Sequence, residues 1–300
     1  MPGISGQAIH QRLAAWLNAE TQPPPRAASD LTRAAPALVP GDVVLVEGRS
    51  RIGQLIKRMS RSPWTHSAIF VGRIRDWDNP EIEARLRDAW PGRDDDYLLL
   101  EAEIGSGAIL SAIDKYRHFN VRICRPQQLT RRDAEKIVAH GLSRLGHDYD
   151  VRQLFDLARL MCPWLLALRR WRSSLFRRRP AKHRRTICST LIADAFYSVD
   201  FPIQPIIRED KHGRLQMNRP NPLLCTPRDF DASPYFDILK FPWIPLSTPG
   251  VYHCFPWERD DPETAAPPAR PVRSRLARMA RNALGALKAL RIRIGPTTTR

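Results

Sequence analysis

Cys188 lies in the stretch RRTICSTLIADAF, between an isoleucine and a hydroxyl residue, at the start of an expected apolar helix. A helix start offers unbonded backbone N–H groups and the positive end of the helix dipole. Both favour a thiolate, which is the nucleophilic form of cysteine. The other interpretation is a buried structural thiol, the more common case for an isolated cysteine. Cys188 is therefore a candidate nucleophile that needs a base beside it.

His66 supplies a candidate base in the stretch SPWTHSAIFVG, where it begins an expected apolar strand. A general base for a thiol needs a rigid position and a neutral imidazole within hydrogen-bond reach. A strand start provides the rigid position. Taken alone, His66 is also explained as a strand-edge histidine with satisfied hydrogen bonds.

Two further side chains could complete such a site. Glu101 ends the apolar run in LLLEAE, where its carboxylate could orient the imidazole from a neighbouring strand, although Glu103 competes for this role. The alternative for either is a solvated charge at a strand end. Tyr149, in GHDYD, has a hydroxyl that can donate to a developing oxyanion, and is otherwise a core aromatic residue.

The elements that must position these side chains alternate between strand and helix patterns. A Pro-Gly turn precedes an expected strand within 39–48, and further strands are expected within 66–74, 96–104 and 119–126, with a turn or strand over 107–116. Helices are expected over 51–62, over 130–146 with Thr130 as its N-cap, and from Ile187 onward, and TPRDFDAS begins a further one. A polar segment of about 25 residues separates the second and third strands. This order indicates an α+β fold.

Charge is distributed unevenly over the 300 residues, which carry a formal net charge of +17. Residues 151–186 contain 11 Lys/Arg and one acidic residue, and residues 270–300 contain nine Lys/Arg and no acidic residue. The rest of the chain is therefore close to neutral. Such asymmetry predicts an anionic partner.

Both basic segments also carry apolar residues at helical spacing, which is typical of a segment lying on a membrane surface. We expect an anionic membrane surface as the partner. A helix docked on the body and a nucleic-acid contact are the two less favoured explanations. No run of apolar residues reaches the length needed to span a bilayer.

Five cysteines without a CxxC pair argue against a zinc finger or a thioredoxin-like site, and are typical of a reducing compartment. The first twenty residues lack the pattern of a signal peptide. These observations predict a cytoplasmic location, at the inner face of the membrane if the basic segments bind lipid. Neither a metal nor an organic cofactor is expected.

The series GDVVLVEGRSRIGQLIKRMSRSPWTHSAIFVG, LLLEA, GHDYD, ICSTLIADAF and TPRDFDAS resembles the circularly permuted papain-like amidases of the YaeF/YiiX type. These are NlpC-like cysteine hydrolases related to lecithin:retinol acyltransferase. In this group the histidine precedes the cysteine, as His66 precedes Cys188. The resemblance covers about residues 39–240. It departs from the compact family pattern in the long segment before Glu101 and in the insert before Cys188.

The resemblance implies an antiparallel, β-barrel-like sheet packed against helices. Together with the residue pattern and the charge distribution, it divides the chain into an N-terminal helix and Pro-rich linker (1–38), a permuted papain-like domain (39–260) with a basic amphipathic insert at 151–186, and a basic amphipathic tail (261–300). It also implies that Cys188 is the nucleophile, His66 the base, Glu101 the residue orienting it, and Tyr149 the oxyanion donor.

The predicted function is that of a cysteine-dependent amidase, hydrolase or acyltransferase that forms a thioester intermediate. Its substrate would be a lipid or peptide amide or ester at a membrane surface, and no obligate protein partner is inferred. The alternative is a catalytically idle papain-like scaffold that binds anionic membrane or nucleic acid through its basic segments.

Overall fold

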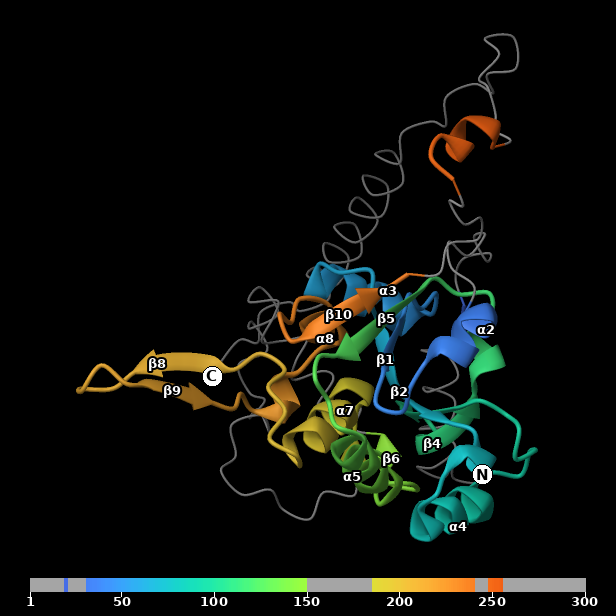
Figure 1. Ribbon diagram of the computed structural model, residues 1–300, viewed down its shortest axis with the longest axis horizontal. Coiled ribbons are helices and arrows are strands. Elements are labelled where there is room, and N and C mark those ends of the chain that lie inside the picture. The colour runs from blue at the N-terminus through green and yellow to red at the C-terminus, as the bar shows by residue number, and fades with distance from the viewer. Residues whose placement is uncertain (1–18, 21–30, 150–184, 241–247, 256–300) are drawn as a thin grey trace, which may run out of the picture. The chain divides into compact units, whose positions relative to one another are not determined.

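A computed structural model of the chain describes residues 19–20, 31–149, 185–240 and 248–255 (Figure 1). The chain divides into two compact units, Met1–Pro245 and Leu246–Arg300. In the second unit the described residues form one short 3-10 helix, η6 (Val251–Cys254). The expected N-terminal helix, residues 21–30 of the linker, most of the basic insert and the basic tail lie outside the described residues, so these predictions stay untested. Residues 31–37 of the segment assigned to helix and linker form two short helices.

A six-stranded sheet organises the first unit, in the order β10-β5-β1-β2-β3-β4 (Figure 1). All of its neighbouring strands pair antiparallel. Its strands are β1 (Val43–Val46), β2 (His66–Gly72), β3 (Leu98–Glu103), β4 (Gly107–Ala112), β5 (Val121–Pro126) and β10 (Phe236–Leu239). The antiparallel sheet packed against helices and the α+β class expected from the sequence are thereby confirmed.

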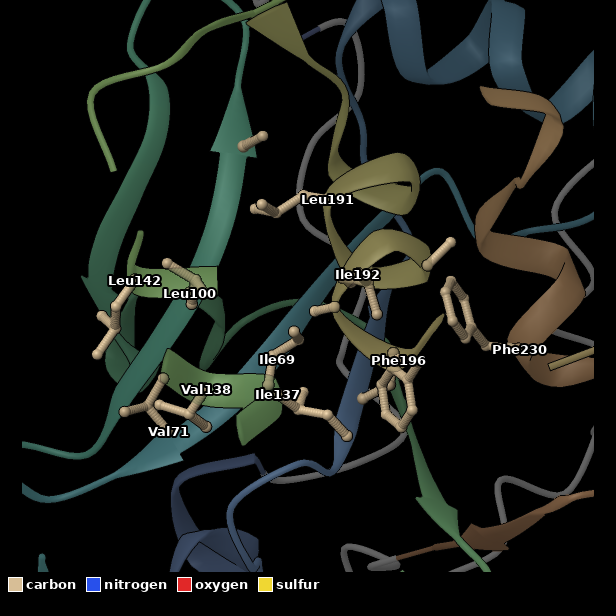
Figure 2. Packing of buried hydrophobic residues seen from close by; sticks show 14 of the residues in the cluster. Ile69, Val71, Leu100, Ile137, Val138, Leu142, Leu191, Ile192, Phe196 and Phe230 are labelled. Carbon is tan, nitrogen blue, oxygen red and sulfur yellow. The ribbon is translucent and has the colours of Figure 1, made fainter. Parts of the chain in front are cut away.

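Both faces of this sheet carry a hydrophobic core, because alternate residues of β1, β2, β3 and β5 belong to different cores. Val43 and Leu45 of β1 pack with helices α5 (Arg131–Leu142) and α7 (Cys188–Tyr197) on one face, as Figure 2 shows for neighbouring residues of this core. Val44 and Val46 pack on the other face with α2 (Leu31–Ala34) and the 3-10 helix η3 (Ile113–Tyr116). The near-continuous apolar runs of the strands follow from this double burial.

Three helices have the ends that their sequences indicate. Ser50 caps α3 (Arg51–Ser60) by accepting a hydrogen bond from the Gly53 N–H, and Thr130 caps α5 in the same way. Thr226 and Asp229 form a capping box at α8 (Pro227–Asp231). These caps set the start of each helix beside the sheet.

The polar segment before β3 contains two elements that the sequence analysis left unassigned, the 3-10 helix η2 (Ile74–Asp76) and α4 (Pro80–Ala89). Asn79 caps α4, Pro80 occupies its first position, and Ile82 and Leu86 are buried. The Asn79 cap and the proline at the first position are helix-start signals that are visible in the sequence. The segment is therefore half helical.

The remaining elements are short. Strands β6 (Asp148–Tyr149) and β7 (Arg185–Thr186) pair in parallel, and β8 (Ile206–Glu209) and β9 (Leu215–Asn218) form a separate hairpin. The 3-10 helices η1 (Ala35–Ala37) and η5 (Pro222–Leu224) complete the set. In the part of the chain that the structure describes, no helix is both long and apolar enough to cross a bilayer.

Candidate active site

Cys188 is the first residue of α7, as the sequence indicated. Ile187 precedes it as N-cap and offers no side-chain hydrogen bond to the helix start. Leu191, Ile192 and Phe196 bury one face of α7 against the sheet, which holds the helix and its first residue in place. Cys188 itself is buried, with 5% of its surface exposed. The nucleophile candidate therefore has a rigid, largely dry position.

His66 is the first residue of β2, and its ring is joined to two other candidate residues. Its Nε2 lies 2.5 Å from Oε2 of Glu101. The ring and the Cys188 sulfur line the same pocket and are close enough for each to shift the pKa of the other. Because Glu101 occupies Nε2, Nδ1 is the nitrogen left to face the sulfur. The three residues thus form one chain from thiol to imidazole to carboxylate.

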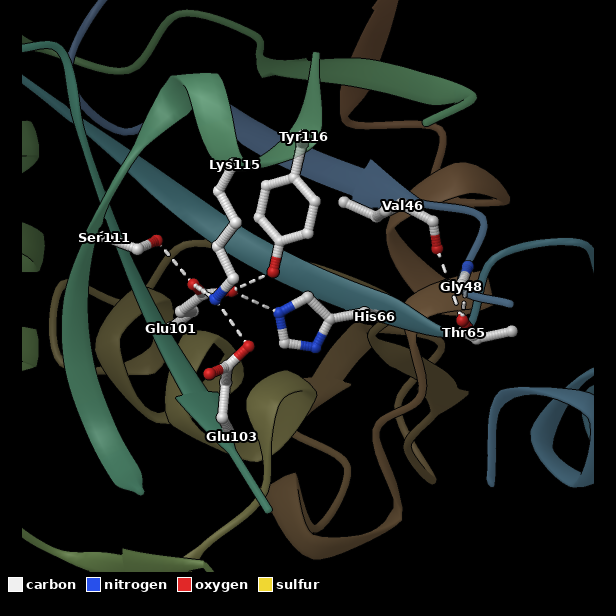
Figure 3. Close-up of polar contacts among 9 residues, drawn as sticks. All are labelled: Val46, Gly48, Thr65, His66, Glu101, Glu103, Ser111, Lys115 and Tyr116. Carbon is white, nitrogen blue, oxygen red and sulfur yellow. Dashed lines mark hydrogen bonds and ion pairs between the residues drawn. The ribbon is translucent and has the colours of Figure 1, made fainter. Parts of the chain in front are cut away.

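Glu101 is fully buried and receives four polar side chains (Figure 3). His66 and Tyr116 bond its Oε2, while Ser111 and Lys115 bond its Oε1. Burial raises the pKa of a carboxyl group, but His66 and Lys115 outweigh burial here and lower the pKa of Glu101. Glu101 is therefore an anion at neutral pH and fixes the orientation of the imidazole.

Glu103 does not take this place. Its carboxylate pairs with Lys115, the same ammonium that bonds Glu101. The sequence did not distinguish the two glutamates, but the structure does: Glu101 hydrogen-bonds His66, whereas Glu103 contacts only Lys115 among these residues.

The pKa values of Cys188 and His66 are shifted in opposite directions. Burial raises the pKa of the Cys188 thiol, but the charge of His66, its hydrogen bond, and hydrogen bonds from Ser67 lower it below its usual value. Burial lowers the pKa of His66, but the charge of Cys188 and hydrogen bonds to Cys188 and Glu101 raise it to about 10. Such shifts favour a thiolate–imidazolium pair at neutral pH.

Other described cysteines lack these partners. Burial raises the pKa of Cys225 well above its usual value and raises that of Cys124 to about 12. Cys254 is exposed and belongs to the second unit, and Cys162 lies outside the described residues. Among the described cysteines of the first unit, Cys188 alone has a lowered pKa.

Tyr149 lies beside Cys188, and both line two adjoining hollows. The larger is a pocket of about 430 Å³ with His66, Arg49 and Lys115 in its wall. The smaller is a slot of about 30 Å³ between α3 and α8, with Met59 and Pro227 in its wall. A substrate can therefore reach the sulfur from the larger pocket, on the side of the base.

The structure adds four residues that the sequence analysis did not single out, Ser67, Ser111, Lys115 and Tyr116. Ser67 follows His66 directly and helps to lower the pKa of the Cys188 thiol, while the others surround Glu101. Burial and the charge of Glu101 raise the pKa of Tyr116, so it remains a donor. The only sequence signal for Ser67 was the presence of a serine inside an apolar strand. For Lys115 and Tyr116 the only signal was their position after a short strand pattern.

These groups can perform acyl-transfer chemistry. A thiolate at a helix start, an imidazole that carries a proton beside it, and a carboxylate behind the imidazole are the parts that nucleophilic catalysis at a carbonyl requires. Within the described residues, no group of three or more His, Cys, Asp or Glu side chains is arranged to hold a metal ion.

Comparisons with known proteins agree with this chemistry. Residues 37–167 match the family model described as permuted papain-like amidase enzyme, YaeF/YiiX, C92 family. This span includes His66, Glu101 and Tyr149, whereas Cys188 lies after it, so the place of the cysteine rests on the geometry above. No curated protein matches the chain.

Among solved structures, the chain is similar to one described as the crystal structure of metalloprotein yiiX from Escherichia coli O157:H7. The two are 14% identical, the TM-score is 0.41, and the match covers 68% of this chain and 97% of that one. At this score the likeness adds no weight to the assignment. The family match over residues 37–167 confirms the resemblance that the sequence motifs indicated: this part of the chain is similar to the permuted papain-like amidases.

Proposed function

We propose that this protein is a cysteine hydrolase of the amidase type, with Cys188 as nucleophile, His66 as base and acid, and Glu101 as the residue that orients the imidazole. The observation that carries the proposal is the continuous contact from Cys188 through His66 to the buried Glu101. The family match over residues 37–167 supports a cysteine peptidase-like amidase but does not by itself assign these roles.

The first step forms a covalent intermediate. The Cys188 thiolate attacks the carbonyl carbon of an amide or ester, a C–S bond forms, and the carbonyl electron pair moves to oxygen. The Cys188 N–H at the helix start and the Tyr149 hydroxyl are our candidates for holding that oxyanion. As the oxyanion collapses, the C–N or C–O bond breaks and the imidazolium proton of His66 passes to the leaving group, which leaves a thioester.

The second step releases the product. Neutral His66 removes a proton from water, the oxygen attacks the thioester carbonyl, and the C–S bond breaks to return the thiolate and a carboxylic acid. An alcohol or amine in place of water would turn hydrolysis into acyl transfer. Throughout, the Glu101 anion keeps Nε2 protonated and Nδ1 directed at the reacting atoms.

We propose a lipid or peptide amide or ester as the substrate, met at an anionic membrane surface. The support for the membrane is the sequence alone: the basic amphipathic segments 151–186 and 270–300 each combine cations with periodic apolar residues. Almost all of the first and all of the second lie outside the described residues.

The test is thiol labelling followed by acylation. With iodoacetamide at pH 7, intact-mass and peptide mapping of the full chain should show Cys188 alkylated well before Cys124 and Cys225, because its thiolate is favoured. With p-nitrophenyl acetate, the wild type should release a burst of nitrophenol and gain a hydroxylamine-sensitive acetyl group. Cys188→Ala should lose both, and Cys225→Ala should keep them. Uniform labelling and no acetyl adduct would instead favour the idle scaffold.

A further inference from the structure

The first residues of strand β2 are not paired with β3, and this unpaired part of the strand lies near Cys188. The Phe70 N–H donates to Asp42 O of the segment leading into β1, so in this antiparallel register the N–H groups of Ser67 and Ile69 point the other way, towards β3. Pairing between β2 and β3 begins at Ile69 with Leu100, although β3 continues to Glu103. The Ser67 N–H therefore lies beyond the ladder.

The N–H and the hydroxyl of Ser67 both lower the pKa of the Cys188 thiol, so both groups lie on the side of the sulfur. The first residue of α7 thus takes the place at which a strand partner would otherwise satisfy Ser67. Because successive side chains of a strand point to opposite faces, His66 turns towards Glu101 while Ser67 turns towards the core that contains α7.

The Ser67 hydroxyl has a second property that needs an explanation. Ser67 is fully buried, and within the described residues its hydroxyl has no hydrogen-bond partner. Burying a hydroxyl without a partner is unfavourable, and buried polar groups of this kind often serve a site. A thiolate beside the hydroxyl supplies the missing acceptor.

We propose that Ser67 is a positioning residue for the nucleophile, which holds the Cys188 sulfur as a thiolate through its hydroxyl and its strand-end N–H, independently of His66. This inference rests on the proposed function, because it gives Cys188 the role of nucleophile. The sulfur is then held by two consecutive residues of one strand, by charge from His66 and by neutral donors from Ser67.

The experiment is the pH dependence of Cys188 alkylation in the full chain. Iodoacetamide rates, followed by peptide mass spectrometry between pH 4 and 10, give the pKa of the thiol for the wild type and Ser67→Ala. We expect the profile of Ser67→Ala to move to higher pH, with a roughly three- to tenfold lower rate at pH values below that pKa, since one neutral hydrogen bond is lost. The plateau at high pH should stay unchanged.

Matched variants separate this role from a merely structural one. Ser189→Ala removes another buried hydroxyl, one residue after Cys188, which donates to the Cys225 carbonyl instead of the sulfur. Its profile should coincide with that of the wild type. Ser67→Thr, which keeps the hydroxyl, should restore the wild-type profile, and Ser67→Cys, a weak donor, should resemble Ser67→Ala.

Two outcomes overturn the inference: a Ser67→Ala profile that coincides with the wild type, or an equal shift in Ser189→Ala. Both outcomes can be distinguished from a failure of the proposed function. If wild-type Cys188 reacts no faster than the other thiols at pH 7, the nucleophile assignment fails. If it reacts fast and Ser67→Ala changes nothing, only the role of Ser67 fails.

Discussion

The Cys188–His66 pair predicts a wide pH range for activity. The active form needs a thiolate, whose pKa is lowered below the usual value, and an imidazolium, whose pKa is raised to about 10. We therefore expect kcat/KM to rise on the acid side below the usual pKa of a cysteine, and to fall as pH rises through about 10 and His66 loses its proton. Initial rates on p-nitrophenyl acetate or an anilide amide, at fixed ionic strength, provide the profile.

The raised pKa of His66 also makes the stability of the fold depend on pH. A histidine whose folded pKa is raised stabilises the fold fully below its unfolded value of about 6.5, and this contribution is lost as pH rises through about 10. A Cys188→Ser variant has no thiolate to pair with His66. The urea midpoint of this variant should therefore depend less on pH between 7 and 10 than the urea midpoint of the wild type. An unchanged dependence would contradict the ion pair.

Glu101 and Glu103 provide a matched pair of substitutions. Glu101→Gln removes the charge behind the imidazole while keeping its size, so the pKa of His66 should fall and kcat should drop by about 10²-fold. Glu103→Gln touches the same Lys115 but not His66, and should change kcat little. Steady-state rates of both variants at pH 7.5 decide this, and equal losses would show that the lysine network as a whole matters more than the contact with His66.

The sequence could name the two glutamates but could not choose between them. Residues 101 and 103 are two positions apart on one strand, so they share a face, and pattern alone gives them equal access. The choice depends on Ser111, Lys115 and Tyr116, which arrive from β4 and η3 to surround Glu101. Such convergence is a tertiary property that spacing along the chain does not contain.

At the scale of elements, the Gly-Asp pair before β1 explains one of the family-like motifs. Asp42 is fully buried, accepts the Val39 N–H, and holds Arg125 of β5 with two hydrogen bonds of 2.9 and 2.7 Å. It therefore ties the entry of β1 to its neighbour strand. Gly41 before it has a positive φ of 96°, which favours glycine.

Asp42→Asn should destabilise this tie without changing the active site. The loss of charge-assisted hydrogen bonds at a buried position should lower the free energy of unfolding by about 2 kcal/mol. Urea unfolding followed by circular dichroism measures this change. Arg131→Gln, which breaks an exposed pair with Asp78, is the control and should cost much less. Equal costs would mean that Asp42 does not carry the tie.

Strong periodicity made several elements predictable. Residue order predicted the apolar faces of α3, α5 and α7, the Thr130 cap of α5, and the apolar runs of β1, β2 and β3. By contrast, β8 and β9 are exposed along their whole length and leave no burial pattern to detect. Strand β10 buries only Phe236 and forms an edge of the sheet, so its local sequence has no burial pattern from which to predict it.

At the scale of the whole molecule, charge is the property that remains to be connected with function. We expect the full chain to float with vesicles that contain anionic lipid and not with neutral vesicles, because each cation near such a surface contributes on the order of 1 kcal/mol. Truncation of residues 270–300 should weaken flotation, and added salt should weaken it further.

The control for this experiment is a short duplex or single-stranded nucleic acid at the same salt concentration. Failure of the full chain to bind anionic vesicles would remove the membrane from the proposal. Tight, salt-dependent binding of nucleic acid instead would turn the basic segments into a nucleic-acid contact, whatever the outcome at Cys188.

The parallel pair β6–β7 has a consequence for how this site can diversify. Asp148 lies opposite Arg185, so the chain departs after Tyr149 and returns within about one strand spacing, directly before Cys188. A parallel return needs only about a dozen residues, and closing a longer loop costs only about 0.6 kcal/mol for each doubling of its length. Segments of different length can therefore be inserted between Tyr149 and Arg185 while the β6–β7 pairing and the start of α7 keep their register.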